Sequence, residues 1–325
     1  MSVLKSNIDQ SVRRQSRLRG DDFLRYLPII VFVVVLGLLA IFVPNFFTPR
    51  NIVNILMQAS ALGLMAIGLT AVLIGGGIDL SIPSVMAMSA VFGAMIMRDG
   101  AHPLVGVLVM LGTAMVAGCI NGYAVAYLKM IPFVVTLAMM TIATGTSIWV
   151  TNSISVAGIP EAFTNTILTR LWIVPVPVFF VAAVTLVVAF WLKRSVFGRW
   201  LYAVGTNERT ARVSGIPTAR VLFGTYVFSS FFAGMAAILL TARLNSAAAT
   251  MGNDGVVLDV VSSAVVGGVS IYGGVGSPLG AVLGAIIITM ISNSMNMMQV
   301  SFFTSLIVKG VVIIAFVALD SLRRR

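Results

Sequence analysis

The sequence places one aspartate, Asp79, in the apolar stretch "TAVLIGGGIDLSIPSVMAMSA". It is the only charged residue from position 51 to position 97. A carboxylate in such surroundings can cap the amides of a helix start, contact a polar solute, or carry a proton or cation. Glycines 75–77 precede it and Pro83 follows, a pattern typical of a break between two helices with proline in the first turn of the second. We therefore expect Asp79 and Ser81 at a helix start, with capping favoured over the other two uses.

Uncharged polar residues follow single faces of the apolar segments. Asn54 and Gln58 are four positions apart, as on one helix face, and Asn121 interrupts an otherwise apolar run. Two longer stripes also have helical spacing: Thr141, Thr144, Ser147 and Thr151, and Thr289, Asn293 and Asn296. Because amides in hydrocarbon need hydrogen-bond partners, these residues either hold helices together or line a path for a polar, uncharged solute such as a sugar or polyol. The candidate path residues are Asn54, Gln58, Asp79, Ser81, Asn121, Thr144, Asn293 and Asn296.

Composition indicates the setting in which these residues act. Of the 325 residues, 59% are hydrophobic and 10% are charged, against about 25% charged in a typical soluble domain. Several runs without Asp, Glu, Lys or Arg are long enough to cross a bilayer as a helix. The sequence predicts an all-α polytopic membrane protein of about ten transmembrane helices, some broken by Gly or Pro. The expected crossings lie near 25–45, 52–74, 81–97, 103–128, 132–150, 172–192, 220–242, 257–275, 278–298 and 303–319.

The basic residues are sorted by loop, so the net charge of +11 does not indicate nucleic-acid binding. With the N-terminus in the cytoplasm, cytoplasmic segments hold 16 of the 21 basic residues. Basic residues concentrate in cytoplasmic loops, so we expect both termini inside, in the inner membrane of a cell. Residues 1–24 are then a basic tail without order, 25–320 a single transmembrane domain, and 321–325 a second basic tail. Asp79 is the sole candidate to meet a charged solute within the spans.

Two interrupted segments resemble each other. They read "LIGGGIDLSIPSVMAMSAVFGAM" and "VVGGVSIYGGVGSPLGAVLGAI", each with a glycine cluster, a step that joins serine and proline, and then small residues. Short hydrophobic segments interrupted by Gly or Pro in the two halves of a chain are a sequence pointer to a transport site. Either an internal duplication or close helix packing explains the likeness.

The longest internal loop, 193–220, is basic and reads "KRSVFGRWLYAVGTNERTARVSGIPTAR". Its pattern predicts a short amphipathic helix that Gly215 and Pro217 end. Such a helix is either a docking surface for another protein or a basic helix that faces lipid.

Catalysis by this chain is not expected. The sequence contains no GxxxxGK[ST] nucleotide-binding loop, and its one histidine, His102, has no Cys or His nearby to form a metal site or nucleophile pair. A single cysteine, Cys119, excludes an internal disulfide framework.

Three stretches carry a resemblance to a known family: "GGGIDLSIPSV", "GRWLYAVGTNERTARVSGI" and "LDVVSSAVVGGVSIYGGVGSPLGAVLGA". From about residue 51 to residue 320 the chain resembles the permease subunits of bacterial ABC importers for monosaccharides, of the ribose-permease type. It departs from the usual pattern at Ile82 and Pro83, where the family has Val-Gly.

The resemblance implies a permease of about ten spans that passes ribose or a similar sugar or polyol to the cytoplasm. It implies three protein partners: an ATP-binding cassette ATPase, a periplasmic sugar-binding protein, and a second permease copy or homologue. ATP and Mg would be bound by the ATPase, with no cofactor or metal on this chain. The residues implied in coupling to the ATPase are Gly205, Asn207, Glu208, Arg212 and Gly215, and Asp259 matches a structural acid.

An ion-coupled secondary transporter of a small polar solute is the alternative. It requires acids within the membrane that hold H⁺ or Na⁺, and Asp79 is the residue that qualifies.

Overall fold

The computed structural model describes residues 29–30 and 32–323. The predicted N-terminal tail lies outside these residues, as do the last two residues of the C-terminal tail. Residues 321–323 continue the last helix rather than forming part of a separate tail.

The chain is an all-α membrane protein, as predicted, and each expected crossing overlaps a helix, although the helix at 257–275 ends at Val266. In the part of the chain that the structure describes, six helices are long and apolar enough to cross a membrane: α2 (Pro49–Ile74), α4 (Pro103–Ala126), α5 (Pro132–Thr151), α7 (Val176–Arg194), α10 (Thr218–Leu244) and α12 (Pro278–Met297). The others at predicted crossings are an apolar helix Phe32–Phe42, α3 (Ile82–Arg98), α11 (Asp254–Val266) and α13 (Phe302–Arg323). α11 has 13 residues, too few to cross the hydrocarbon alone, so the count of ten crossings stays a prediction.

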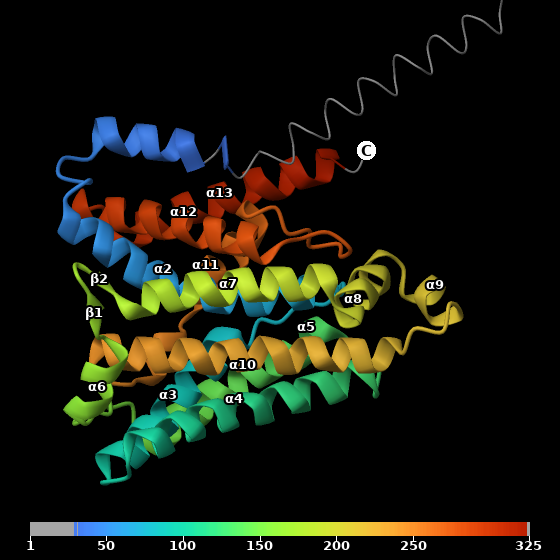
Figure 1. Cartoon of the computed structure of the whole chain (residues 1–325), viewed down its shortest axis with the longest axis horizontal. Coiled ribbons are helices and arrows are strands. Elements are labelled where there is room, and N and C mark those ends of the chain that lie inside the picture. Colours follow the sequence, from blue (N-terminus) through green and yellow to red (C-terminus); the bar gives the residue numbers. More distant parts are fainter. Residues whose placement is uncertain (1–28, 31, 324–325) are drawn as a thin grey trace, which may run out of the picture.

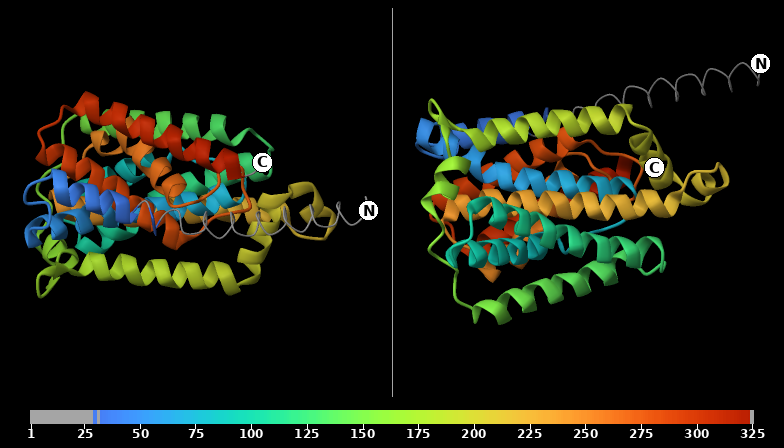
Figure 2. Two further views of the ribbon diagram at one scale, coloured as in Figure 1. Left: turned by 90° about the horizontal axis from the view of Figure 1, so that it is seen from above. Right: turned by 60° about the horizontal axis from the view of Figure 1, so that its bottom comes forward.

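Helices α2 and α10 form the centre of the bundle, and α4, α5 and α7 lie at its periphery (Figures 1 and 2). In the most apolar stretch of α2, 83% of residues are buried, against 28% in α5 and α7. Phe190 on α7 and Trp149 on α5 are among the large apolar side chains on the outer surface. An exposed apolar surface of this kind suits lipid contact.

Small residues let α4 approach α10 closely. Gly118 and Gly122 form a GxxxG spacing on the face of α4 that meets α10. An added Cβ at Gly118 would lie 2.6 Å from the Cβ of Ser230, and one at Gly122 would lie 2.9 Å from the carbonyl oxygen of Phe223. This close approach buries Asn121, between the two glycines, in the bundle interior.

The two ends of the bundle differ. One end, here called the hairpin end, carries α6 (Glu161–Ile167) and the antiparallel pair β1 (Arg170–Leu171) and β2 (Val174–Pro175). The opposite end, the α9 end, carries α8 (Val196–Thr206) and α9 (Glu208–Val213), and α13 ends on that side (Figure 1). A 3₁₀ turn, η1 (Ala249–Gly252), joins α10 to α11.

The two interrupted segments predicted from the sequence have the same backbone geometry where their helices end. Two residues after the end of α2 lies Gly76 at φ +81°, and two residues after the end of α11 lies Gly268 at φ +82°. The next amide donates back to the helix in each case: Gly77 to Val72 at 3.0 Å, and the residue after Gly268 to Ala264 at 2.9 Å. Both ends are Schellman motifs, in which glycine adopts a left-handed backbone conformation at no steric cost. After each of these two helix ends, the backbone continues without helix to a serine N-cap, and a proline follows in the first turn of α3 or α12.

Candidate functional site

Asp79 lies in the break between α2 and α3 and is 2% exposed. Its Oδ1 accepts hydrogen bonds from the Ser81 amide at 3.0 Å and the Ser81 hydroxyl at 2.6 Å. Its Oδ2 accepts from the Ser229 hydroxyl on α10 at 2.9 Å. Both carboxylate oxygens are therefore engaged, and the acid fastens the break to a neighbouring helix. Ser81 is the N-cap residue of α3 and its side chain makes no cap hydrogen bond, so Asp79 stabilises the turn that leads into α3, and its capping of first-turn amides stays a prediction.

The network extends to α4, and separate polar contacts one turn along α3 involve α5 and η1. The Asn121 amide donates to the Ser81 hydroxyl at 2.9 Å. One turn along α3, the Ser84 hydroxyl lies 3.1 Å from that of Thr144 on α5 and donates to the Gly252 carbonyl at 3.4 Å. Four of the predicted path residues, Asp79, Ser81, Asn121 and Thr144, are thus gathered around the start of α3.

The other predicted path residues lie elsewhere. Asn54, at the hairpin end of α2, accepts a hydrogen bond of 3.0 Å from Arg243, and Gln58 lies half-buried one turn along. On α12, Asn293 is buried and Asn296 is exposed. The buried oxygens Oδ1 of Asn121 and Oδ1 of Asn293 have no hydrogen-bond partner among residues 32–323.

Two further charged residues of the bundle, Asp259 and Lys309, form an ion pair with each other. Asp259 on α11 pairs with Lys309 on α13, with Nζ at 2.8 Å from Oδ1 and 3.0 Å from Oδ2. Lys309 is 9% exposed. The two residues are 50 positions apart, so helix spacing could not reveal the pair. The pair joins the short α11 to the last helix and neutralises both charges, which fits a structural acid.

The predicted coupling residues occupy two places. Asn207, Glu208, Arg212 and Gly215 belong to α9 and its ends. The Asn207 side chain caps this helix by accepting from the Thr210 amide at 2.9 Å. Glu208 and Arg212, one turn apart on α9, form an ion pair. Glu208 also lies 3.6 Å from Lys129 in the α4–α5 loop, so α9 is tied to a neighbouring loop.

Gly205 lies instead at a junction of three chain segments. An added Cβ there would collide with the carbonyl oxygen of Ile74, at the end of α2, and lie 2.7 Å from the amide nitrogen of Gly274. The Tyr202 hydroxyl, one turn earlier on α8, donates to the Gly276 carbonyl at 2.8 Å. Burial raises the pKa of this hydroxyl, so it stays a donor. The end of α8 therefore contacts the break after α2 and the break after α11 together.

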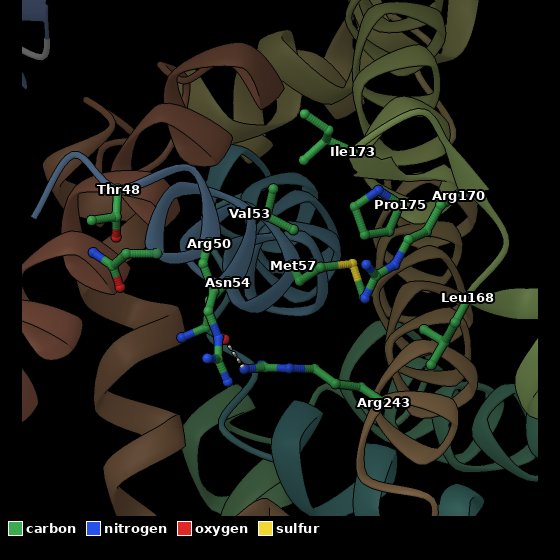
Figure 3. Close-up of a pocket in the computed structure, with 11 residues that line it drawn as sticks. Thr48, Arg50, Val53, Asn54, Met57, Leu168, Arg170, Ile173, Pro175 and Arg243 are labelled. Atoms are coloured by element: carbon green, nitrogen blue, oxygen red, sulfur yellow. Dashed lines mark hydrogen bonds between the residues drawn. The ribbon is translucent and has the colours of Figure 1, made fainter.

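Each end of the bundle has a cavity beside these elements. A cavity of about 180 Å³ at the α9 end is lined by Gly75–Gly77, Lys129, Glu208 and Tyr226. A larger cavity of about 820 Å³ lies at the hairpin end (Figure 3). Arg50 and Asn54 reach it from α2, Arg170 from β1 and Arg243 from α10.

Sequence reasoning did not single out Ser229 or the arginines of the large cavity as site residues. Ser229 belongs to a Ser-Ser pair in an otherwise apolar helix, which is a signal of the same kind as Asn121. The arginines lie far apart in the sequence, and their meeting depends on tertiary packing. No cluster of three or more His, Cys, Asp or Glu that could hold a metal lies in the described part of the chain.

Comparison with known proteins gives a consistent result. Residues 51–317 match a family described as the permease component of a branched-chain amino acid transport system. The ribose import permease protein RbsC of Bacillus subtilis (strain 168) is 35% identical over 318 residues, covering 96% of this chain and 98% of that protein. The D-allose transport system permease protein AlsC of Escherichia coli (strain K12) is 33% identical, covering 98% of this chain and 97% of that protein. The L-arabinose transport system permease protein AraH of the same strain is 31% identical, covering 93% of this chain and 92% of that protein. No solved structure matches significantly.

Proposed function

This chain belongs to the family of transport-system permease components, and from that premise we propose that it is the membrane-spanning subunit of an ATP-driven importer of a monosaccharide or polyol. The observation that carries the proposal is the match along nearly the full chain to permeases of ribose, allose and arabinose import. The sugar class, the energy source and the partners are parts of the proposal.

The interior favours a sugar over the amino acid in the family's description. A zwitterionic solute needs opposite charges along its path, since an unpaired charge in a low-dielectric interior is costly. Asp79 has both oxygens engaged, and the charges of Asp259 and Lys309 are directed at each other. The groups around the start of α3 are mostly hydroxyls and one amide, which suit the hydroxyls of a sugar.

The proposed orientation places the α9 end in the cytoplasm and the hairpin end outside. Basic residues concentrate at the first, including Lys193, Arg194, Arg199, Arg209, Arg212 and Arg220. The ATPase, which binds ATP and Mg, then docks on α8 and α9, and a solute-binding protein approaches the hairpin end. A second permease copy or homologue completes a pair, with the solute path at the shared interface.

Coupling follows from contacts of the α8–α9 segment. A displacement of α9 is transmitted to the α4–α5 loop through the contact between Glu208 and Lys129. A displacement of α8 is transmitted to both helix breaks through Gly205, because the backbone of Gly205 contacts Ile74 and lies next to Gly274. Packed elements move as bodies in such transitions, so one displacement can shift both breaks together.

Reconstitution tests this proposal. Proteoliposomes with this permease, its ATPase and its solute-binding protein should accumulate labelled ribose, allose or arabinose only when ATP is supplied. An ionophore that collapses the proton gradient should leave uptake intact. Uptake without ATP that the ionophore abolishes would replace the proposal with the ion-coupled alternative.

A further inference from the structure

The large cavity at the hairpin end is strongly basic. Three arginines from three elements reach it: Arg50 from the first turn of α2, Arg170 from β1 and Arg243 from the last turn of α10. Figure 3 shows their side chains around one space, with Arg243 extended toward Asn54. Because like charges repel, gathering three guanidinium groups around one cavity costs free energy in the absence of an anion.

The described chain supplies no anion to balance them. No Asp or Glu whose side chain the structure describes lies within ion-pair distance of Arg50, Arg170 or Arg243. Arg243 donates to the neutral amide oxygen of Asn54. By contrast Arg98, the last residue of α3, pairs with Asp99 at 3.0 Å. The three cavity arginines are therefore placed to receive carboxylates from another molecule, which guanidinium groups bind in a bidentate fork.

The interior of the bundle indicates that this anion does not pass through. An anionic solute that left the cavity would next meet polar groups that include the carboxylate of Asp79. The one described lysine in the bundle, Lys309, is already paired with Asp259. An anion would lose its favourable charge partners on entry, so the anionic group belongs to a molecule that stays outside.

The size of the cavity favours a group of side chains over a small ion. Its volume of about 820 Å³ is near the upper end of the range of roughly 300–1,000 Å³ for sites that take drug-sized ligands. A protruding acidic segment of a folded protein fits such a space.

We infer that this cavity is the docking site for acidic side chains of the solute-binding protein that delivers the substrate. The inference rests on the proposed function, since it requires such a protein. Charge complementarity between the two surfaces would speed their association and set their register.

The test uses the permease with its ATPase in nanodiscs of phosphatidylcholine, and measures binding of the solute-loaded binding protein at several salt concentrations. The variants are Arg170→Gln, Arg243→Gln and Arg50→Gln, with Arg170→Lys to keep the charge. Arg98→Gln, outside the cavity, is the matched control. We expect each cavity variant to weaken binding by roughly tenfold or more, mainly by slower association at low salt, and to reduce the salt dependence. Arg170→Lys should retain most of the binding.

Folding is checked separately by the thermal unfolding midpoint, which Arg170→Gln on the exposed hairpin should leave unchanged. Equal binding by wild type and all three cavity variants would overturn the docking site while leaving the importer intact. Absence of binding by wild type would overturn the docking site together with the proposed partner. Nanodiscs that also contain phosphatidylglycerol test a lipid headgroup as the anion. If the cavity variants bind the solute-binding protein as wild type does but retain less phosphatidylglycerol, the anion is a lipid headgroup and the inference is wrong.

Discussion

The backbone amide of Gly274 donates a 2.8 Å hydrogen bond to the carbonyl oxygen of Ile74. Ile74 is the last residue of α2, and Gly274 lies in the loop between α11 and α12. The two helix breaks, about two hundred positions apart, are therefore joined directly. Gly205 packs against the same carbonyl, so the coupling segment contacts the joint itself.

Gly205→Val should separate the coupling segment from this joint. A side chain at that position collides with backbone atoms, which cannot rotate away, and we expect a loss of roughly 1–3 kcal/mol in stability with loss of solute-stimulated ATP hydrolysis. The measurements are the unfolding midpoint in detergent and hydrolysis in proteoliposomes. Gly145→Ala is the control, because the space beside Gly145 on α5 is open. Full coupling in Gly205→Val would show that the joint is not part of the transmission path.

Asp79→Asn should lower transport in part, whereas Asp79→Leu should lower expression and stability. An amide oxygen can still accept from Ser81, but leucine leaves the amide and hydroxyls without an acceptor, each at a cost of about 1–3 kcal/mol. Ser229→Ala, which removes one donor, should fall between wild type and Asp79→Leu. Unfolding midpoints and uptake rates measure this order. Normal assembly with complete loss of uptake in Asp79→Asn would point to contact with the solute or an ion.

Asp259 and Lys309 should behave as a coupled pair. Asp259→Leu or Lys309→Met leaves an uncompensated charge in the membrane interior, and each single change should cost about 3–5 kcal/mol. The double variant should be more stable than either single one. A double-mutant cycle on unfolding free energies measures the coupling. Additive effects would mean that the two charges do not depend on each other.

Glu208→Arg and Gly215→Val should leave the permease folded but uncouple it from its ATPase. The first reverses the charge that holds Arg212 and Lys129. The second places a β-branched residue at φ +82°, which such residues resist. The isolated Glu208–Arg212 pair contributes only about 0.2–0.5 kcal/mol, so a large effect must come from the partner.

Co-purification of the ATPase and solute-stimulated hydrolysis are measured for both variants of α9. Arg209→Gln, exposed on the same helix, serves as the control. If both variants retain the ATPase and normal stimulation, α9 has no part in coupling.

Much of the fold was predictable because its signals are local. Apolar run length indicated where helices lie, and the glycine and proline positions indicated both breaks, since backbone conformation depends on neighbouring residues. The helix that ends near Gly215 and its Glu208–Arg212 pair follow from spacing along one helix. Asp79 was recognisable because a lone acid in an apolar run needs partners.

The partners themselves depend on the tertiary structure. Ser229 meets Asp79 across 150 positions, and Lys309 meets Asp259 across 50, because the packing of α10 and α13 decides which faces touch. The arginines of the large cavity looked like separate loop charges until α2, β1 and α10 brought them together. The sequence by itself determined the class of protein and the places where its helices break. Only the tertiary structure decided which distant charges and hydroxyls share a site, because long-range contacts leave no periodic trace in the chain.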